Sequence, residues 1–325
     1  MKITILGAGA YGIALSLMFN KKKSNEIVLW EKFKEAEMTL NKTRENKRVL
    51  PGIKIPKNIK ITSNLEEAVK GANLIVVAVP AGFVNDTAIE LAKYIKNNQH
   101  ICIASKGIEQ GTCLFLSDVI TKHIKTKKLA VIAGPSFAID IANNVPIGLS
   151  LASKNKNTRK LLHDTLENDT LKLRDTTDVI GIEICSSIKN VIAIASGMIG
   201  GMNLPESTQA MFITESLHDI KALIKALGGN GKTILSFAGF GDLLLTCTST
   251  KSRNYSFGNL IGSGAKEKEI TEYINSTTIE GLYTLKSIHK LLRNKKVKIP
   301  VINLIYDIVF HSKKPETIKT FLISK

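Results

Sequence analysis

The 325-residue sequence predicts a doubly wound parallel α/β sheet followed by an all-helical domain. Two observations predict the sheet: a glycine-rich turn directly after a short apolar segment, and further apolar segments that alternate with helical ones. Beyond about residue 178 no β alternation remains, and the apolar residues follow helical spacing. At about 150 residues per domain, the length also suits two domains. We therefore expect domains at residues 1–180 and 181–325.

The predicted strands of the first domain are short apolar runs at residues 2–6, 26–30, 73–79, 101–104 and 129–133. The predicted helices between them cover residues 13–19, 31–42 and 82–95. Because parallel strands are joined by right-handed crossovers, this alternation predicts helices wound around a central sheet.

The predicted helices of the second domain are separated by glycine, asparagine and proline. They cover residues 178–200, 205–227, 233–246, 254–262, 267–275, 279–293 and 300–311. The first of them is apolar nearly all round, which is typical of a buried helix.

The composition is that of an ordinary globular protein, with 44% hydrophobic and 22% charged residues. It excludes a long disordered chain, a collagen-like repeat and a disulfide-dense miniprotein. No apolar run reaches the roughly 18 residues that a membrane span needs, so we expect no stable membrane insertion. Gly7 follows the first apolar residues too early for a secretory signal peptide, and we therefore expect no export.

The chain is strongly basic, with 45 Lys and Arg against 28 Asp and Glu and a net charge of +17. Such an excess is compatible with nucleic acid, an acidic membrane surface or anionic substrates as partners. We interpret most of the lysines as solvated surface, because aromatic residues are only 6% and leave little for base stacking. A basic nucleic-acid-binding module is the alternative, and it predicts salt-sensitive binding to DNA or RNA.

The four cysteines are Cys102, Cys113, Cys185 and Cys247. None forms a CxxC pair or a cluster with histidine, so we expect no metal site. Cys102 and Cys185 stand in apolar runs and are predicted to be reduced core residues. A reducing cytoplasm fits this usage best.

The turn at residues 7–12 has the form GxGxxG between a strand and a helix. Gly7 permits the tight turn, Gly9 lets the backbone approach a pyrophosphate, and Gly12 lets the helix pack closely on the strand. In this position the pattern indicates a Rossmann-type dinucleotide site, with phosphates at the helix N-terminus. The alternative is a glycine-rich turn that binds no ligand.

Glu31 and Lys32 follow the second predicted strand, where the adenosine ribose of a dinucleotide is bound. Glu31 would accept hydrogen bonds from the ribose hydroxyls of NAD, whereas Lys32 would meet the 2′-phosphate of NADP. Both cofactors therefore remain open. The alternative for both residues is an exposed helix start.

Lys189 is a lone cation in the apolar helix at 178–200. An ammonium buried there costs several kcal/mol unless it is paired or faces a polar cleft. Desolvation would lower the pKa of such a lysine into the range of a general acid or base. The alternative is that Lys189 reaches solvent or pairs with a structural carboxylate such as Asp242.

Two polar motifs follow predicted strands, where ligands bind in open α/β sheets. Lys106 lies in Ser105-Lys106-Gly107, and Gly134 and Ser136 lie in the segment 133–138. Taken singly, each motif is read more simply as a surface lysine or a helix cap.

The segment 248–255 gathers hydroxyls, an amide and two cations before a predicted helix start. Arg253 offers a bidentate fork, and the helix N-terminus adds partial positive charge. This combination favours a phosphomonoester over a polar loop with an ordinary cap.

The whole chain resembles the bacterial type of NAD(P)-dependent glycerol-3-phosphate dehydrogenase. The resemblance rests on GAGAYG at 7–12, LPGIKIP at 50–56, SKG at 105–107, AGPSFA at 133–138, IKNVIAIASG at 188–197, GFGDLLLTCTS at 239–249, SRN at 252–254 and IEG at 279–281. The order and spacing of these motifs match together, which is more specific than any one of them.

This resemblance implies reversible hydride transfer between NAD(P)H and dihydroxyacetone phosphate, which gives sn-glycerol 3-phosphate. It implies that Lys189 relays the proton. It implies a substrate pocket lined by Lys106, Gly134, Ser136, Lys189, Asp242, Ser252, Arg253 and Asn254. It implies cofactor contacts from Ala10, Tyr11, Lys32, Lys106, Ala138, Arg253, Thr278 and Glu280, beside the glycines and Glu31. It also implies a cytoplasmic homodimer whose product supplies phospholipid synthesis.

Two positions depart from the family pattern. This chain has Glu215-Ser216 where the family often has Arg-Gly, and Lys32 where Arg or His is commoner.

Another two-domain dehydrogenase, acting on a 3-hydroxy acid, is the nearest enzyme alternative. Such an enzyme would share the glycine turn and the lysine on the apolar helix. A 3-hydroxy acid substrate does not, however, explain the presence of Ser252-Arg253-Asn254.

Overall fold

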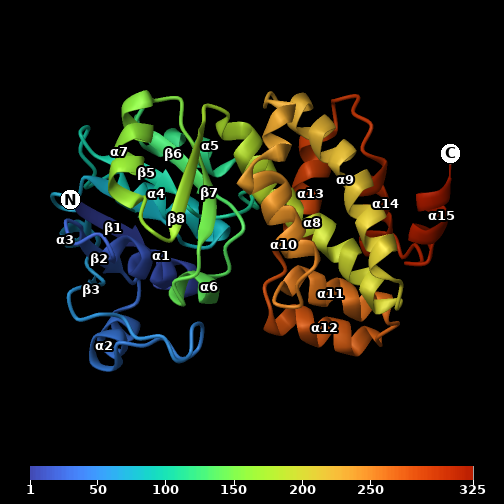
Figure 1. Cartoon of the computed structure of the whole chain (residues 1–325), viewed down its shortest axis with the longest axis horizontal. Helices are drawn as coiled ribbons and strands as arrows, with labels where there is room; N and C mark the ends of the chain where they lie inside the picture. The colour runs from blue at the N-terminus through green and yellow to red at the C-terminus, as the bar shows by residue number, and fades with distance from the viewer. Residues whose placement is uncertain (325) are drawn as a thin grey trace. The chain divides into compact units, whose positions relative to one another are not determined.

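The computed structural model describes residues 1–324 and divides into two compact units (Figure 1). The first unit comprises residues 1–109 and 114–179. The second comprises residues 110–113 together with the chain from Ile180 onward.

The first unit is built on one eight-stranded sheet in the order β3-β2-β1-β4-β5-β6-β7-β8. The strands are β1 (Lys2–Leu6), β2 (Glu26–Trp30), β3 (Lys60–Thr62), β4 (Leu74–Val77), β5 (His100–Ile103), β6 (Leu129–Ala133), β7 (Ile147–Ala152) and β8 (Leu171–Thr176). All five predicted strands are present. The order from β3 to β6 is that of a dinucleotide-binding sheet, and the strand order reverses between the parallel neighbours β1 and β4.

The prediction of a wholly parallel sheet is wrong at one pair, because β7 runs antiparallel to β6. The connection between them contains only α6 (Ala138–Ala142), a helix of five residues. Such a helix rises about 7.5 Å, roughly half the length of β6 at about 3.3 Å per residue. The chain therefore turns back before it has passed the full length of the sheet. β3, β7 and β8 lie outside the ranges that the sequence pattern predicted.

Helices cover the sheet, which explains why its strands are almost continuously apolar. They are α1 (Ala10–Asn20), α2 (Lys34–Thr43), α3 (Leu65–Val69), α4 (Val84–Leu91), α5 (Leu116–His123), α6 and α7 (Lys156–Leu166), with a 3₁₀ turn η1 (Ala81–Phe83). α1 packs against α6, and α4 packs against α5 (Figure 1). α2 begins later than predicted, because residues 31–33 are not helical and Phe33 has extended backbone angles.

The described part of the second unit is helical. Its helices are α8 (Val179–Gly201), α9 (Glu206–Ala226), α10 (Asp242–Cys247), α11 (Arg253–Gly262), α12 (Glu267–Ser276), α13 (Glu280–Leu292), α14 (Pro300–Phe310) and α15 (Thr317–Ile323), with short turns η2 (Gly231–Leu235) and η3 (Phe237–Gly241). The predicted helix at 233–246 is broken, because Gly239 has a non-helical ψ of −107°. α15 was not predicted.

α8 is long and apolar enough to cross a membrane by length and composition, contrary to the expectation that no run reaches that length. However, 89% of its most apolar window is buried inside the protein. Figure 1 shows α8 running among the other helices of its unit. We therefore describe α8 as the core helix of the second unit.

Glycines bring the backbones of α8 and α11 into direct contact. A Cβ atom at Gly197 would lie 2.0 Å from the carbonyl oxygen of Tyr255, and one at Gly258 would lie 1.7 Å from that of Ile194. No side chain fits at either position without separating the helices. This contact fixes the start of α11 relative to the middle of α8.

A buried carboxylate links α9 to α14. Asp219 is 2% exposed and accepts a hydrogen bond from the backbone N–H of Ile302 at 3.0 Å. Burial raises the pKa of Asp219 to about 6, although the N–H groups of Ile302 and Val301 act in the opposite direction. Near neutral pH the protein therefore holds a desolvated negative charge at this joint.

We predict that Asp219 makes the stability of the protein depend on pH. The pKa of the Asp219 carboxyl is raised in the folded protein. Between about pH 4 and pH 6 this carboxyl is therefore protonated in the folded protein but ionised in the unfolded chain. Stability then falls as pH rises through this range, by at most about 3 kcal/mol. Asp219→Asn should lack this dependence, as measured by denaturant unfolding followed by circular dichroism from pH 4 to pH 7.

Glu206 provides the matched control, since it is an exposed carboxylate in the first turn of the same helix and is remote from Asp219 along the chain. Glu206→Gln should unfold with the same pH dependence as the parent protein. Parallel curves for the parent and Asp219→Asn would show that the Asp219 carboxyl does not titrate in this range.

Candidate functional site

The glycine turn joins β1 to α1 and has the geometry that a phosphate site requires. Gly7 has a φ of +113°, and a Cβ atom at Gly12 would lie 1.9 Å from the Gly7 carbonyl oxygen, so both positions need glycine. A Cβ at Gly9 would meet nothing within 4 Å. Gly9 also caps α1 without a side chain, which leaves the first N–H groups of α1 without a side-chain acceptor. The turn therefore fits the pyrophosphate of a dinucleotide.

Asn46 supports this turn and was not predicted as a site residue. Its Nδ2 donates to the carbonyl oxygen of Ala8 at 3.3 Å. The preceding Arg44 has a left-handed φ of 54° and donates to the carbonyl oxygens of Ile55 and Ile59. These contacts fold the segment after α2 against the glycine turn. Only the three-dimensional structure brings these segments together, so no local motif could have indicated them.

Four predicted residues meet at the ends of β5 and β6 and the start of α1. The Lys106 ammonium lies 5.3 Å from the centroid of the Tyr11 ring. The hydroxyls of Tyr11 and Ser136 are 3.2 Å apart, and that of Ser136 donates to the Gly134 carbonyl oxygen at 3.0 Å. A Cβ at Gly134 would lie 2.5 Å from the backbone oxygen of Gly148, so this position requires glycine. Ala138 begins α6, which packs on α1.

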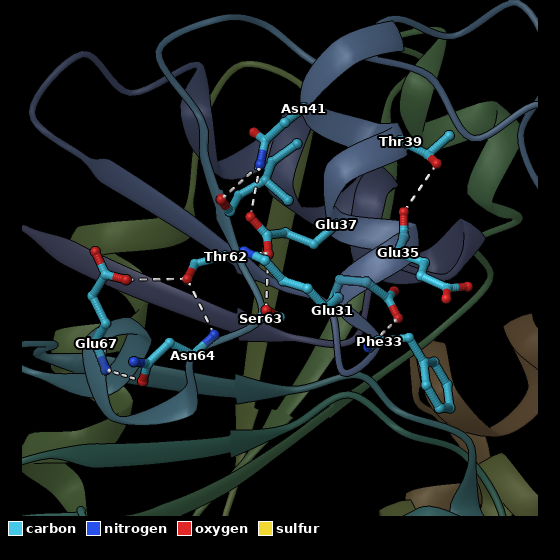
Figure 2. Close-up of polar contacts among 12 residues, drawn as sticks. Glu31, Phe33, Glu35, Glu37, Thr39, Asn41, Thr62, Ser63, Asn64 and Glu67 are labelled. Carbon is cyan, nitrogen blue, oxygen red and sulfur yellow. Dashed lines mark hydrogen bonds and ion pairs between the residues drawn. The ribbon is translucent and has the colours of Figure 1, made fainter.

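The end of β2 lies beside the glycine turn. The N–H of Gly7 donates to the carbonyl oxygen of Trp30 at 3.0 Å, and Glu31 is the next residue. The Glu31 carboxylate accepts a hydrogen bond from the N–H of Phe33 at 3.2 Å (Figure 2). Lys32 is exposed. The structure thus places Glu31 next to the turn that Gly7 begins.

The second unit contains a buried ion pair between α8 and α10. The Lys189 Nζ lies 2.6 Å from Oδ1 of Asp242, and the two side chains are 7% and 2% exposed. Lys189 therefore does not reach solvent, and it pairs with Asp242, the partner that was expected under the alternative to a role as general acid or base. The pairing offsets the cost of burying the ammonium and holds it in one orientation.

α10 is tied to α8 at its other end as well. Ser196 on α8 donates its hydroxyl to the carbonyl oxygen of Cys247 at 2.8 Å, and Gln209 donates to the same oxygen at 3.1 Å. Asp242, at the start of α10, is thus held between two contacts with the core helix. Burial raises the pKa of the Cys247 thiol, which keeps it protonated and unreactive.

The segment at 252–254 forms the start of α11. The Ser252 hydroxyl caps the helix by accepting from the N–H of Tyr255 at 3.3 Å. Arg253 is exposed, whereas Asn254 is buried and its Oδ1 accepts from the N–H of Gly281 at 2.9 Å. The cap leaves the first two N–H groups of α11 without a side-chain acceptor from Ser252.

Two amide contacts join α13 to the helices that carry Lys189 and Asn254. Asn190, next to Lys189, donates to Oε2 of Glu280 at 3.0 Å. Asn254 contacts Gly281 in the same first turn of α13. The first turn of α13 is therefore tied to Asn190 on α8 and to Asn254 on α11. Thr278, which precedes α13, is exposed and belongs to the loop.

The remaining candidate residues are structural. Glu215 is exposed, and Ser216 is buried with its hydroxyl donating to the Phe212 carbonyl oxygen at 2.8 Å. All four cysteines are buried thiols, as predicted for Cys102 and Cys185. Within residues 1–324, no three His, Cys, Asp or Glu side chains are grouped so that they could hold a metal ion.

We predict that the Lys189–Asp242 pair decides the stability of the second unit. Asp242→Ala leaves an unpaired ammonium in the core and should lower the free energy of unfolding by about 3–5 kcal/mol. The double variant Lys189→Met/Asp242→Ala buries no charge and should recover most of that loss. Thermal and denaturant unfolding measure both; equal losses in the single and double variants would contradict a buried pair.

Comparisons with known proteins match both units. The family model described as the N-terminus of NAD-dependent glycerol-3-phosphate dehydrogenase matches residues 2–159, and its C-terminal counterpart matches residues 178–320. The chain is 34% identical to the NAD(P)+ glycerol-3-phosphate dehydrogenase of Fusobacterium nucleatum, over 96% of this chain and 93% of that protein. It is also 34% identical to the glycosomal NAD+ enzyme of Leishmania mexicana, over 99% and 90% of the two chains.

A solved structure of glycerol-3-phosphate dehydrogenase from Coxiella burnetii has the same fold. It superposes with a TM-score of 0.91 at 31% identity, over 100% of this chain and 99% of that chain. Because the matched domains cover both structural units, this protein belongs to the NAD-dependent glycerol-3-phosphate dehydrogenase family.

Proposed function

We propose that this protein catalyses the reversible, NAD(P)H-dependent reduction of dihydroxyacetone phosphate to sn-glycerol 3-phosphate. The observation that carries the proposal is the buried Lys189–Asp242 pair, at 2.6 Å, on a helix in backbone contact with the start of α11. A cation at that place is suited to proton transfer. The start of α11 is suited to a phosphate, and the first unit has a turn suited to a dinucleotide.

The first unit would hold the cofactor. Its pyrophosphate would bind at the turn formed by Gly7, Gly9, Ala10, Tyr11 and Gly12. Glu31 and Lys32 would meet the adenosine ribose, and further contacts would come from Lys106, Ala138, Arg253, Thr278 and Glu280. When bound, NAD(P)H supplies the hydride that is added to the ketone carbon.

Lys189 would donate the proton to the ketone oxygen as the hydride reaches the carbon. The reduction consumes one hydride and one proton, so the ammonium becomes an amine and must take up a proton before the next turnover. Asp242 favours the protonated form of Lys189 and fixes the direction of its Nζ. The positive charge also stabilises the alkoxide that develops on the substrate oxygen.

The substrate phosphate would bind at the N-terminus of α11. The Arg253 guanidinium offers two parallel N–H donors, and the first N–H groups of the ten-residue helix add partial positive charge. Asn254 keeps its Nδ2 available as a donor while its Oδ1 is held by Gly281. Ser252, Lys106, Gly134 and Ser136 would complete the substrate contacts. These groups orient the ketone and do not take part in the chemistry.

The proposed reaction also has a proposed cellular location, oligomeric state and metabolic role. We propose a cytoplasmic homodimer that supplies glycerol 3-phosphate for glycerophospholipid synthesis and has no nucleic-acid partner. The direct test is the loss of absorbance at 340 nm when dihydroxyacetone phosphate is added with NADH or NADPH. A phosphate-free 3-keto acid serves as the comparison substrate, and faster turnover of that acid would favour a 3-hydroxy acid dehydrogenase.

We predict that Lys189→Ala lowers kcat by about 10²-fold or more, the usual loss when a general acid is removed. Dinucleotide binding should be preserved, because the glycine turn is in the other unit. Lys189→Met/Asp242→Ala controls for stability, since it should be folded and equally inactive. Near-normal turnover in either variant would remove Lys189 from the mechanism.

We predict that Arg253→Ala raises the KM for dihydroxyacetone phosphate by about tenfold or more, the scale of one lost charge-assisted contact. Lys251→Ala removes a positive charge two residues earlier and is the matched control for charge alone. Steady-state kinetics at saturating cofactor separate the two. An unchanged KM in Arg253→Ala would place the phosphate elsewhere.

A further inference from the structure

The proposed function leaves open which of the two dinucleotides the protein uses. NADP differs from NAD by one phosphate on the 2′ oxygen of the adenosine ribose, so the residues around that oxygen decide between them. The names of the relatives include both NAD(P)+ and NAD+ enzymes. The choice for this chain therefore depends on its own residues 31–37, after β2.

Glu31 is held where the ribose hydroxyls would lie. The preceding residue, Trp30, accepts the N–H of Gly7 at the glycine turn, and the N–H of Glu31 donates to the carbonyl oxygen of Thr62 at 3.0 Å. Its carboxylate accepts one hydrogen bond from the N–H of Phe33. An ionised carboxylate has about four acceptor positions, so this contact leaves Glu31 able to accept ribose hydroxyls. The same carboxylate repels a 2′-phosphate.

Lys34 is paired with a buried glutamate, although its own side chain is 69% exposed. Its Nζ lies 2.5 Å from Oε2 of Glu37, which is buried in the first turns of α2. The Glu37 carboxylate also accepts from the Ser63 hydroxyl at 2.8 Å and from Nδ2 of Asn41 at 3.1 Å (Figure 2). These bonds tie Glu37 to the segment after β3. The Lys34 ammonium is thereby held at a carboxylate.

The charge of the whole segment is negative. Residues 31–37 contain three glutamates, two lysines and no arginine, the residue that best matches a phosphate. Lys32, which precedes α2, is exposed, and Glu35 in the first turn of α2 is exposed as well. The nearby Arg44 directs its guanidinium to the backbone oxygens of Ile55 and Ile59.

We propose that this protein selects NADH over NADPH, with Glu31 as the specificity-determining residue and Glu37 as the residue that positions Lys34. This inference rests on the proposed dinucleotide site. It goes beyond that site, because it names the one cofactor and the residues that exclude the other.

Direct binding tests the proposal without turnover. Trp30 is the single tryptophan of the chain and precedes Glu31, so energy transfer to the reduced nicotinamide of a dinucleotide bound at this site should quench its emission. We expect NADH to bind at least about tenfold more tightly than NADPH at fixed ionic strength. One charge-assisted hydrogen bond is enough for a difference of that size.

Three variants distinguish the roles. Glu31→Gln keeps an acceptor but removes the charge, and it should lower the NADH/NADPH affinity ratio by about tenfold, chiefly by tighter NADPH binding. Glu37→Gln should free Lys34 and lower the ratio in the same direction, by about threefold or more. Glu35→Gln, an exposed glutamate on the same turn, should leave the ratio within about twofold.

Lys34→Ala keeps the proposal testable if Glu37→Gln does not fold. Because Lys34 is held by Glu37, this variant should bind NADPH as weakly as the parent protein does. A large further loss of NADPH affinity would mean that Lys34 meets the 2′-phosphate, and the role assigned to Glu37 would be wrong.

The outcomes separate this inference from the proposed function. Equal affinities of the parent protein for NADH and NADPH would overturn the selectivity. So would tighter binding of NADPH by the parent protein together with an unchanged NADH/NADPH affinity ratio in Glu31→Gln. Either result would leave the dehydrogenase proposal standing. Failure of both nucleotides to bind would overturn the dinucleotide site and the selectivity with it. An isothermal titration with each nucleotide checks the result independently of Trp30.

Discussion

The buried pair between Lys189 and Asp242 is the contact on which the second unit depends. α8 is apolar along almost its whole length, and an ammonium in its middle is tolerated only because a carboxylate lies 2.6 Å away. That requirement fixes the start of α10, and the bond from Ser196 to Cys247 fixes its end. The charge that the proposed chemistry needs is thus also the reason why α10 lies where it does.

In both units, a glycine without a side chain lets two backbone segments pack in direct contact. In the first, Gly12 lets α1 begin against the carbonyl oxygen of Gly7, so the helix N-terminus opens directly from the sheet. In the second, Gly258 lets α11 pack on the backbone of α8 at Ile194. Each contact brings a helix start close to a rigid element. Backbone contacts therefore hold these helices in place before any ligand arrives.

The sequence predicted what is local and left out what depends on distant contacts. The strand–glycine–helix order at residues 2–19 and the apolar surroundings of Lys189 are properties of short segments, and the structure has both. β7 and β8 were missed, and their antiparallel and parallel pairings depend on how the short α6 turns back. Asn46 was missed because its contact with Ala8 joins residues 38 positions apart.

Net charge illustrates the same difference between global and local properties. The chain carries +17, which by itself favours the extra phosphate of NADP. At physiological ionic strength, however, exposed charges are screened over about 8 Å, so a 2′-phosphate responds mainly to the residues beside it. Those residues include the carboxylate Glu31. Lys34, at the start of α2, is paired with Glu37. The overall excess of lysine can assist the encounter with an anionic cofactor, while the local carboxylates decide which cofactor stays bound.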